Sequence, residues 1–523
     1  PERERPAAER PTRRRAGRER ARALGLDSDG CLWTDEGMQV EPGRLRTVVD
    51  LCTRALDLMP EGGTVALTAA AAVALGYPAA PRPTPAKATK ADPEPRAVTE
   101  AAARGWQHSR DGVLAYTTWW EAEGRRPAVT LVVPEWMEES QQHTNTAGNT
   151  LLGPGDDVMR AAYLLGRMRQ VCGGVPWTMT AGLTGVSMIR RHWMTATGRY
   201  RTDPRAPRGQ APKLKYNEDE RTERASILLP HEAEAWWTRE LSQAEAAPGM
   251  WAHTWDVRLA YCAALGSAVL PRDAINYQGE IMLGDLFKRA GAEIARAGFV
   301  EIANKPYRIG DGPNLAGPPP RGQEEARTRI VDVVTAGLLL KLGFLEGMAR
   351  VPFWGCDDPK AFGRLLRPVA DQMRDAALAV PEDTDDPEEA RIVQAAKGLY
   401  REGVGMLRRG GSFVRRPDWQ STVVATNRTN LFRKMLAVHE KTGLMPVEIN
   451  LDGLVYISDS PDPIAPEGMT VADASDPKKI AGRFAHKGAV PVDEYLAARD
   501  EQRRKAEEKQ RKWEKFGFGK AGE

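Results

Sequence analysis

Cysteine, histidine and long apolar runs are scarce in this chain. The five cysteines are odd in number, scattered and never in C-x-x-C spacing, which predicts free thiols in a reducing compartment. The seven histidines form neither an H-E-x-x-H motif nor a Cys/His cluster, so a structural zinc site is not expected. No apolar run has the length of a membrane span, and the N-terminus lacks the apolar segment of a signal peptide. We therefore expect a cytoplasmic protein without a membrane partner.

Net charge is also small, since 74 Lys+Arg against 71 Asp+Glu leave only +3. This balance excludes a histone-like binder and an acidic disordered chain, so any basic surface must be local. Lysine is rare beside arginine, with 19 Lys and 55 Arg, a bias typical of a high-GC genome, and each Lys is therefore informative. A length of 523 residues predicts three or four domains. Because the sequence begins with Pro1 rather than Met, it can be a fragment that lacks an N-terminal module.

The first hundred residues divide by composition into three parts. Residues 1–40 predict a flexible basic arm, because the first 22 contain nine Arg and four Glu; contact with nucleic-acid phosphates and a solvated tail both stay open. Residues 41–78 show helical spacing and predict a small helical region, either the start of a helix-turn-helix or, as we favour, a helical cap. Residues 79–100 contain five prolines and predict a linker.

Two acids follow strand-like segments far apart in the sequence. Residues 251–256 are bulky and strand-favouring, and Asp256 stands at their end before a helical segment. Residues 446–457 read as apolar strand, Asp-Gly turn and apolar strand, which is a hairpin pattern with Asp452 at its tip. Taken singly, each acid is typical of a turn or a helix cap. Residues 128–133 and 157–172 further predict a buried strand and an amphipathic helix.

A helical hairpin is predicted between these two acids. Residues 361–380 and 390–407 have helical spacing, with a kink expected at Pro368 and an acidic connection between the helices. In the second helix Lys397, Arg401 and Gly405 are four residues apart and share one face. Two cations beside a glycine suit a polyphosphate that approaches the backbone closely, and a solvated basic stripe is the alternative. A long helix is predicted at 421–441.

The order of these motifs resembles family B DNA polymerases over roughly residues 226–496. Motif A of that family is D-x-x-S-L-Y-P, and residues 256–262 match it at Asp256 and Tyr261. Motif B is K-x-x-x-N-S-x-Y-G, which residues 397–405 match at the Lys and the Gly. Motif C is D-T-D-S between apolar strands, and residues 450–453 keep its second Asp, Asp452.

Several positions depart from the family pattern. Asn450 replaces the first Asp of motif C, and Val404 replaces the Tyr of motif B. Leu259, Arg401 and Glu402 also replace polar family residues. The tripeptide at 383–385 spells Asp-Thr-Asp, but it lies between prolines without flanking strands. We interpret it as the exposed tip of the helical hairpin.

The resemblance implies nucleotidyl transfer from a dNTP to a primer 3′-hydroxyl, with two Mg²⁺ or Mn²⁺ ions as cofactors. Asp256 and Asp452 would be the catalytic residues and the metal ligands. Tyr261 would exclude a 2′-hydroxyl from the sugar site. The implied nucleotide-binding residues are Tyr261, Lys397, Arg401, Gly405 and Arg374.

The implied fold class is α+β, a polymerase right hand preceded by a degenerate exonuclease-like α/β domain and the small helical region. The expected domains are exonuclease-like 101–225, palm 226–357 and 411–475, helical-hairpin fingers 358–410, and a short thumb or C-terminal helix 476–523. The N-terminal Asp-x-Glu of the family nuclease has one counterpart, Asp92-Pro-Glu94 in the proline-rich linker. Weak or absent proofreading is therefore expected. Asp156, Asp157 and Glu135 are either remnants of the nuclease acids or, as we favour, a helix N-cap pair and a loop acid.

A second resemblance concerns natural context. The Arg/Ala-rich composition and residues 105–136 look similar to telomere-associated proteins of actinobacterial linear replicons. This resemblance implies a replicon, phage or chromosome end as template and a terminal or priming protein as partner, besides primer-template DNA and dNTPs. Two alternatives stay open: a polymerase-fold DNA-end binding protein that has lost catalysis, and a transcription factor built on residues 45–76.

Overall fold

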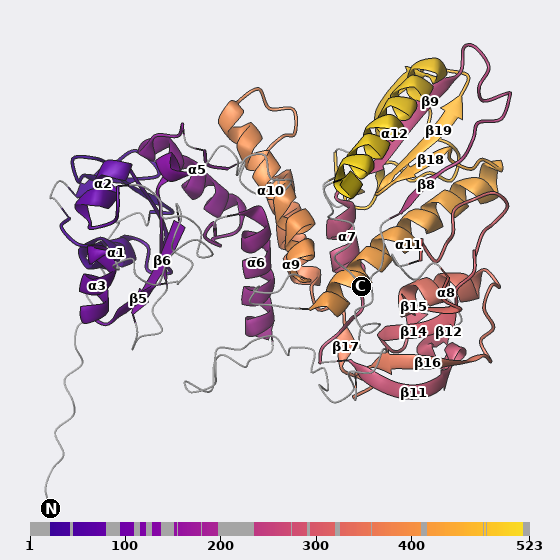
Figure 1. Ribbon diagram of the computed structural model, residues 1–523, viewed down its shortest axis with the longest axis horizontal. Coiled ribbons are helices and arrows are strands. Elements are labelled where there is room, and N and C mark those ends of the chain that lie inside the picture. The colour runs from indigo at the N-terminus through magenta and orange to yellow at the C-terminus, as the bar shows by residue number, and fades with distance from the viewer. Residues whose placement is uncertain are drawn as a thin grey trace, which may run out of the picture. The chain divides into compact units, whose positions relative to one another are not determined.

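The computed structural model describes most of the chain in segments. They are residues 21–41, 45–79, 95–108, 116–121, 128–137, 151–153, 155–178, 180–196, 235–273, 275–289, 293–319, 325–356, 358–408, 416–473, 475–476 and 479–515. Two compact units result, unit 1 with residues 1–180 and 382–395 and unit 2 with residues 181–381 and 396–523. Figure 1 shows the elements of both.

Unit 1 contains a seven-stranded mixed sheet with the order β3-β2-β1-β4-β7-β6-β5. Strands β1, β4 and β7 run parallel to one another, and the remaining neighbours are antiparallel. The strands are β1 (Leu24–Leu26), β2 (Leu32–Thr34), β3 (Gln39–Glu41), β4 (Gly63–Leu67), β5 (Trp106–His108), β6 (Tyr116–Glu121) and β7 (Val129–Val132). The strand predicted at 128–133 is therefore confirmed as β7.

Two sequence predictions for the N-terminal part are wrong. Residues 24–40 include strands β1, β2 and most of β3 instead of belonging to a basic arm, and residues 1–20 lie outside the described chain. Strand β4 separates the two helices expected at 41–78, so these form neither a helix-turn-helix nor a cap. Most of the predicted proline-rich linker, residues 80–94, lies outside the described residues, whereas residues 96–100 are helical, and β4 and β7 on either side of it pair in one sheet. Strands of three residues carry too little periodicity to be recognised, and a short apolar run fits a strand as well as a helix.

Helices of unit 1 pack on this sheet, and all but the last of them share one apolar core with it. They are α1 (Val48–Leu58), α2 (Ala69–Ala74), α3 (Arg96–Ala103), the short η1 (Pro134–Trp136) and α5 (Val158–Val171). The helix predicted at 157–172 is confirmed, and Asp157 caps α5 by accepting from two backbone N–H groups. Asp156 does not cap the helix, because its carboxylate instead binds Arg391 through two hydrogen bonds of 2.6 and 2.7 Å. Glu135 accepts from the backbone N–H of Ala69 at the start of α2.

Unit 2 is built on a five-stranded antiparallel sheet with the order β20-β9-β19-β18-β8. These strands are β8 (Trp236–Thr238), β9 (Trp251–Val257), β18 (Glu448–Asn450), β19 (Gly453–Ser458) and β20 (Phe484–Pro491). One face carries Trp255, Ile449 and Leu454 into the main core of the unit. The strand at 251–256 and the hairpin at 446–457 are thus confirmed.

A second sheet of unit 2 lies between these strands in the sequence. It has the order β11-β16-β14-β15, and its strands are β11 (Asn276–Met282), β14 (Gly298–Ala303), β15 (Thr328–Asp332) and β16 (Arg350–Gly355). Two further strand pairs are β10 (Leu270–Pro271) with β17 (Phe362–Gly363), and β12 (Phe287–Arg289) with β13 (Glu293–Ile294). The short η4 (Leu283–Leu286) precedes β12. Much of the sequence between β9 and the predicted hairpin helices is therefore β-structure.

The remaining helices include the ones that the sequence predicts. They are α6 (Ala181–Ala196), α7 (Ala260–Ser267), α8 (Val333–Lys341), α9 (Arg367–Leu378), α10 (Pro387–Met406), α11 (Pro417–Thr442) and α12 (Val492–Lys515). Helix α11 confirms the long helix, and α9 and α10 confirm two helices joined by an exposed turn that contains residues 383–385. Pro368 does not kink a helix, because α9 begins at Arg367 and Pro368 lies in its first turn, where a missing N–H costs nothing.

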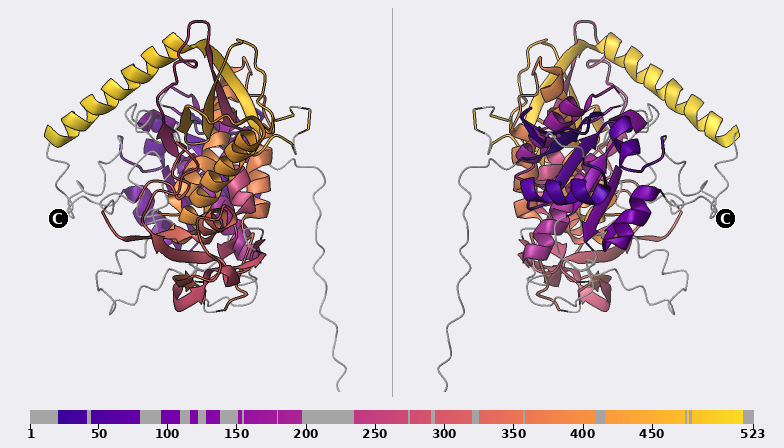
Figure 2. Two further views of the ribbon diagram at one scale, coloured as in Figure 1. Left: turned by 90° about the vertical axis from the view of Figure 1, so that its right-hand side faces the viewer. Right: turned by 90° about the vertical axis from the view of Figure 1, so that its left-hand side faces the viewer.

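The C-terminal helix α12 packs against β9 and β20 and then extends away from the strands (Figure 2). Val492 joins Ala252, Val447 and Val455 in a small apolar cluster on the sheet face opposite to Trp255. Tyr495 donates a hydrogen bond of 2.7 Å to Glu448. None of the helices that the structure describes has the length and apolar composition needed to cross a membrane.

Candidate active site

The two predicted acids lie beside each other in unit 2. Asp256 is the penultimate residue of β9, and Asp452 belongs to the two-residue turn between β18 and β19. Gly453 pairs with Asp256 across the strands, and the Val257 N–H donates to the Asp452 carbonyl over 3.0 Å. This register brings the carboxyl groups of Asp256 and Asp452 within hydrogen-bonding reach of each other.

The backbone beside both acids adopts an uncommon conformation. Among the described residues, the two non-glycine residues with positive φ are Leu259, at 51°, and Leu451, at 58°. Leu259 follows Asp256 by three residues and precedes α7, and Leu451 immediately precedes Asp452. Left-handed backbone at a branched, bulky residue is costly, and such strain is concentrated at functional sites.

The carboxyl pair has an unusual protonation equilibrium. Burial raises the pKa of Asp452 to about 7, and the negative charge of Asp256 and a hydrogen bond between the two groups act in the same direction. Arg401 opposes this shift, which places its positive charge near Asp452. From β20, the Lys487 ammonium lies 3.8 Å from Asp256. Two carboxyl groups that share a proton can instead bind a divalent cation between them, which takes the place of that proton.

Helix α10 carries two of the cations that the sequence predicts. Arg401 is exposed and Lys397 half-buried, one turn apart. Gly405, one turn further, has open space where a side chain would project. Val404 is only 2 % exposed, so the residue at the family's Tyr position packs inside the protein. The structure thus places Arg401 near the acids, with Lys397 and Gly405 along the same helix.

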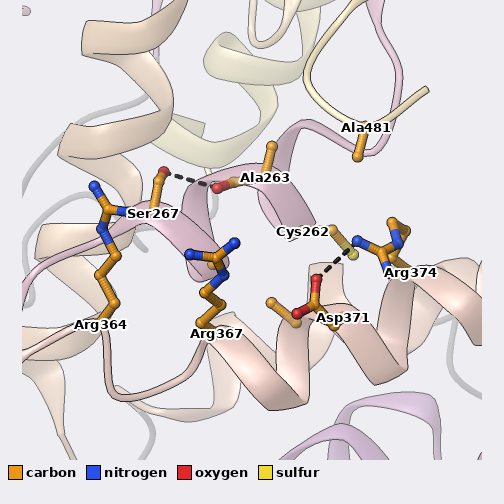
Figure 3. A pocket seen from close by; sticks show the side chains of 10 residues that line it. Cys262, Ala263, Ser267, Arg364, Arg367, Asp371, Arg374 and Ala481 are labelled. Atoms are coloured by element: carbon orange, nitrogen blue, oxygen red, sulfur yellow. Dashed lines mark hydrogen bonds and ion pairs between the residues drawn. The ribbon is translucent and has the colours of Figure 1, made fainter. Parts of the chain in front are cut away.

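A basic pocket of about 270 Å³ lies between α7 and α9. Figure 3 shows Arg364, Arg367 and Arg374 extending from the α9 side towards Ser267 and Cys262 of α7. Arg374 is held by Asp371 at 2.7 Å and Asp375 at 2.8 Å. Helix α7 also carries Tyr261, which is half-buried in its first turn. Arg374 therefore lines the pocket, whereas Tyr261 belongs to the same helix as the opposite wall without being one of the lining residues.

Three cations of this site were not predicted from the sequence. Arg364 and Arg367 line the pocket, but in a chain with 55 Arg neither stands out. Lys487 is one of only 19 Lys, the same scarcity that marks Lys397. No motif surrounds it, and its role depends on the pairing of β20 with β9.

The acids fit a metal-binding role with few protein ligands. Among the described residues, no group of three or more His, Cys, Asp and Glu side chains could hold a metal ion. Mg²⁺ in polymerase-type sites is bound by one or two carboxylates together with substrate phosphates and waters. The pair of Asp256 and Asp452 meets this description, because both are hard oxygen donors and their mutual repulsion favours a cation between them.

The chain was compared with known proteins. A model of the domain of unknown function DUF8841 matches residues 55–168, which lie in unit 1. The search of curated proteins gave no match. The chain is similar to Phi29 DNA polymerase in its orthorhombic crystal form, at 12% identity and a TM-score of 0.38, over 73% of this chain and 69% of that chain.

Two further Phi29 DNA polymerase structures show the same level of similarity. The ternary complex with primer-template DNA and incoming nucleotide substrates has 12% identity and a TM-score of 0.39, over 73% of this chain and 70% of that chain. The complex with single-stranded DNA has 13% identity and a TM-score of 0.36, over 73% and 69%.

Proposed function

We propose that this chain is a template-directed DNA polymerase that transfers a nucleotidyl group from a dNTP to a primer 3′-hydroxyl. The observation that carries the proposal is the pair of Asp256 and Asp452, held within hydrogen-bonding reach at a strand end and a hairpin tip. Cations surround this pair, Arg401 from α10 and Lys487 from β20. The acids at the centre are suited to bind divalent metal ions, and the cations around them are suited to bind phosphate.

Asp256 and Asp452 would hold the divalent ions, Mg²⁺ or Mn²⁺. When bound, such ions activate the 3′-hydroxyl and neutralise charge on the leaving pyrophosphate. The chain's own residues supply the remaining binding. Arg401 and the pocket arginines neutralise the triphosphate, and their planar guanidinium groups match phosphate oxygens. Lys397 and Arg374 assist in the same task, and Gly405 admits the nucleotide close to the α10 backbone.

The right-hand layout follows from this assignment. The five-stranded sheet acts as the palm, α9 and α10 act as the fingers, and α12 acts as a short thumb. Tyr261, in the first turn of α7, contacts the sugar and disfavours a 2′-hydroxyl. The partners are primer-template DNA and dNTPs, and a terminal protein would serve as primer on a linear replicon.

Primer extension with Mg²⁺ tests the proposal. The parent chain incorporates dNTPs, whereas Asp452→Asn lowers the rate by roughly a thousandfold, because the metal contributes several kcal/mol. Asp383→Asn is the matched control, since Asp383 is an exposed acid of the tip between α9 and α10. No incorporation by the parent refutes the function. Equal incorporation by the parent and Asp452→Asn refutes the site.

A second candidate is a polymerase-like DNA-end binding protein without catalysis. Asn450 favours it, because this exposed residue lies in the cross-strand row of Asp256 and stands where the family has a further acid. This candidate predicts DNA binding without incorporation by either the parent chain or Asn450→Asp. Incorporation by the parent excludes it.

A further inference from the structure

One large aromatic side chain near the carboxyl pair has no role in the function proposed so far. Trp236, on the edge strand β8, is 61% exposed, whereas its neighbour Trp237 packs against the main core of unit 2. Exposure of so large an apolar side chain costs hydration free energy that burial would recover. The position of Trp236 on the sheet therefore bears on whether this side chain binds a ligand.

Strand register places Trp236 on the same sheet face as Asp256. Trp236 pairs with Asn450, Asn450 with Gly453, and Gly453 with Asp256, so the four residues form one cross-strand row. Directly opposed residues of antiparallel strands project from the same face. Residues of the adjacent row, among them Trp237, Ile449 and Trp255, project into the core on the other face.

The row also fixes how far Trp236 lies from the acids. One strand spacing, about 5 Å, separates the backbones of Trp236 and Asn450, and three spacings, roughly 15 Å, separate Trp236 from Asp256. The backbone is held there, because the Leu451 N–H donates to the Ala235 carbonyl over 2.8 Å. A stacked strand advances about 3.4 Å per nucleotide. Trp236 is therefore within about four nucleotides of a strand end that reaches the carboxyl pair.

The surroundings of Trp236 suit a nucleobase better than a protein partner. A protein-docking surface needs a contiguous apolar patch, but the row continues from Trp236 with Asn450, Gly453 and Asp256 before it reaches the small side chain of Ala485 on β20. A single aromatic face among polar groups is what a base requires for stacking. The exposed Asn450 beside it offers an amide that can donate to and accept from a base or sugar.

We infer that Trp236 is a nucleic-acid binding residue that stacks on a base of the primer strand, within about four nucleotides of its 3′ end. This inference rests on the proposed function for the identity of the strand. The contact positions the primer end at Asp256 and Asp452 without reading its sequence, because every base offers a π-face.

Binding of a fluorescent primer-template to the full chain, measured by anisotropy with Ca²⁺ in place of Mg²⁺, tests the inference. Trp236→Ala weakens binding by about 5- to 140-fold, the equivalent of 1–3 kcal/mol of stacking, and Trp236→Phe recovers most of it. Tyr277→Ala is the matched control, since Tyr277 is 55% exposed on the separate sheet of β11. Equal affinity of the parent and Trp236→Ala overturns the inference.

Abasic sites identify the strand and the position. In the parent, an abasic site at one of the last four primer positions weakens binding, and in Trp236→Ala the same lesion has no further effect. A loss that is confined to template lesions, or that is the same in both proteins, overturns the assignment. Because binding is measured without turnover, failure of the proposed catalysis would appear separately, as DNA binding by the parent without incorporation in Mg²⁺.

Discussion

At the residue scale, Asp452 has the unusual protonation equilibrium on which the proposed metal site depends. Its pKa is raised from 3.8 to about 7, first by burial and then by Asp256. The folded chain therefore binds this proton more tightly than the unfolded chain. The resulting stabilisation is complete below 3.8 and is lost as the pH rises through about 7. Without a bound metal ion, the carboxyl pair therefore contributes least to the stability of the fold at a pH where both groups are ionised and can bind such an ion.

The direction of this pKa shift predicts how the stability of the protein depends on pH and on bound metal. In metal-free buffer, the melting temperature of the parent falls by about 1–2 °C between about pH 6 and about pH 8. Added Mn²⁺ restores the loss at the higher pH, because it binds the ionised pair. In Asp452→Asn, both the fall and the Mn²⁺ effect are smaller. Thermal unfolding of the two proteins checks this, and identical pH profiles would contradict the raised pKa.

At the element scale, small residues set the distance between α6 and α10. A Cβ atom added to Gly185 of α6 would lie 2.1 Å from the carbonyl oxygen of Leu399 in α10 and 3.2 Å from Gly403. The helices therefore approach backbone to backbone. This contact holds the part of α10 that carries Lys397 and Arg401, so the position of these cations depends on Gly185, which lies outside the predicted motifs.

Two glycine substitutions separate packing from nucleotide access. Gly185→Ala lowers the free energy of unfolding by about 1–3 kcal/mol, because rigid backbone opposes the new methyl group. Gly405→Ala does not, since nothing lies within 4 Å of its added Cβ atom and Ala favours a helix by roughly 0.5–1 kcal/mol. Under the proposed function, Gly405→Ala instead raises the KM for dNTP. Urea unfolding and steady-state kinetics measure the two effects, and equal stability loss in both variants would refute this division.

At the scale of the whole molecule, we predict weak or absent 3′–5′ excision. In unit 1, β1 is followed by Asp27, whose carboxylate accepts from the Cys31 backbone N–H at 2.8 Å and the Trp33 indole N–H at 2.7 Å. These bonds use the Asp27 carboxylate to hold the loop between β1 and β2, so we do not expect it to serve metal-dependent excision. Incubation of the parent with a primer that ends in a mismatch, with Mg²⁺ and without dNTP, leaves the primer intact. Shortening of the primer that survives in Asp452→Asn would contradict this prediction.

The sequence was most informative where a pattern is local. Asp256 and Asp452 could be found because an apolar segment before an acid and an Asp-Gly turn between apolar runs are each contained within a dozen residues. Pairing between distant segments could not be predicted from the sequence. Trp236 is placed in the row of Asp256 only by the pairing of β8 with β18, more than two hundred residues later. Lys487 is placed beside Asp256 only by the pairing of β20 with β9.

The N-terminal sheet was missed for the same physical reason. Strands β1, β2 and β3 have three residues each, too few to show a period of two. Their stability comes from pairing with β4, and through it with β7, across the proline-rich stretch. Composition therefore suggested an arm where the fold has strands β1, β2 and β3, and it did not show that β4 and β7, on either side of the proline-rich stretch, belong to one sheet.

Incorporation of a single nucleotide opposite a defined template base tests the central claim most directly. With Mg²⁺, a primer end and each dNTP supplied separately, the account predicts that the parent adds the complementary nucleotide in preference to the other three. It also predicts that Asp256→Asn and Asp452→Asn each slow this addition by roughly a thousandfold, while Asp383→Asn retains it. Addition that ignores the template base, or that persists in both site variants, would contradict the account.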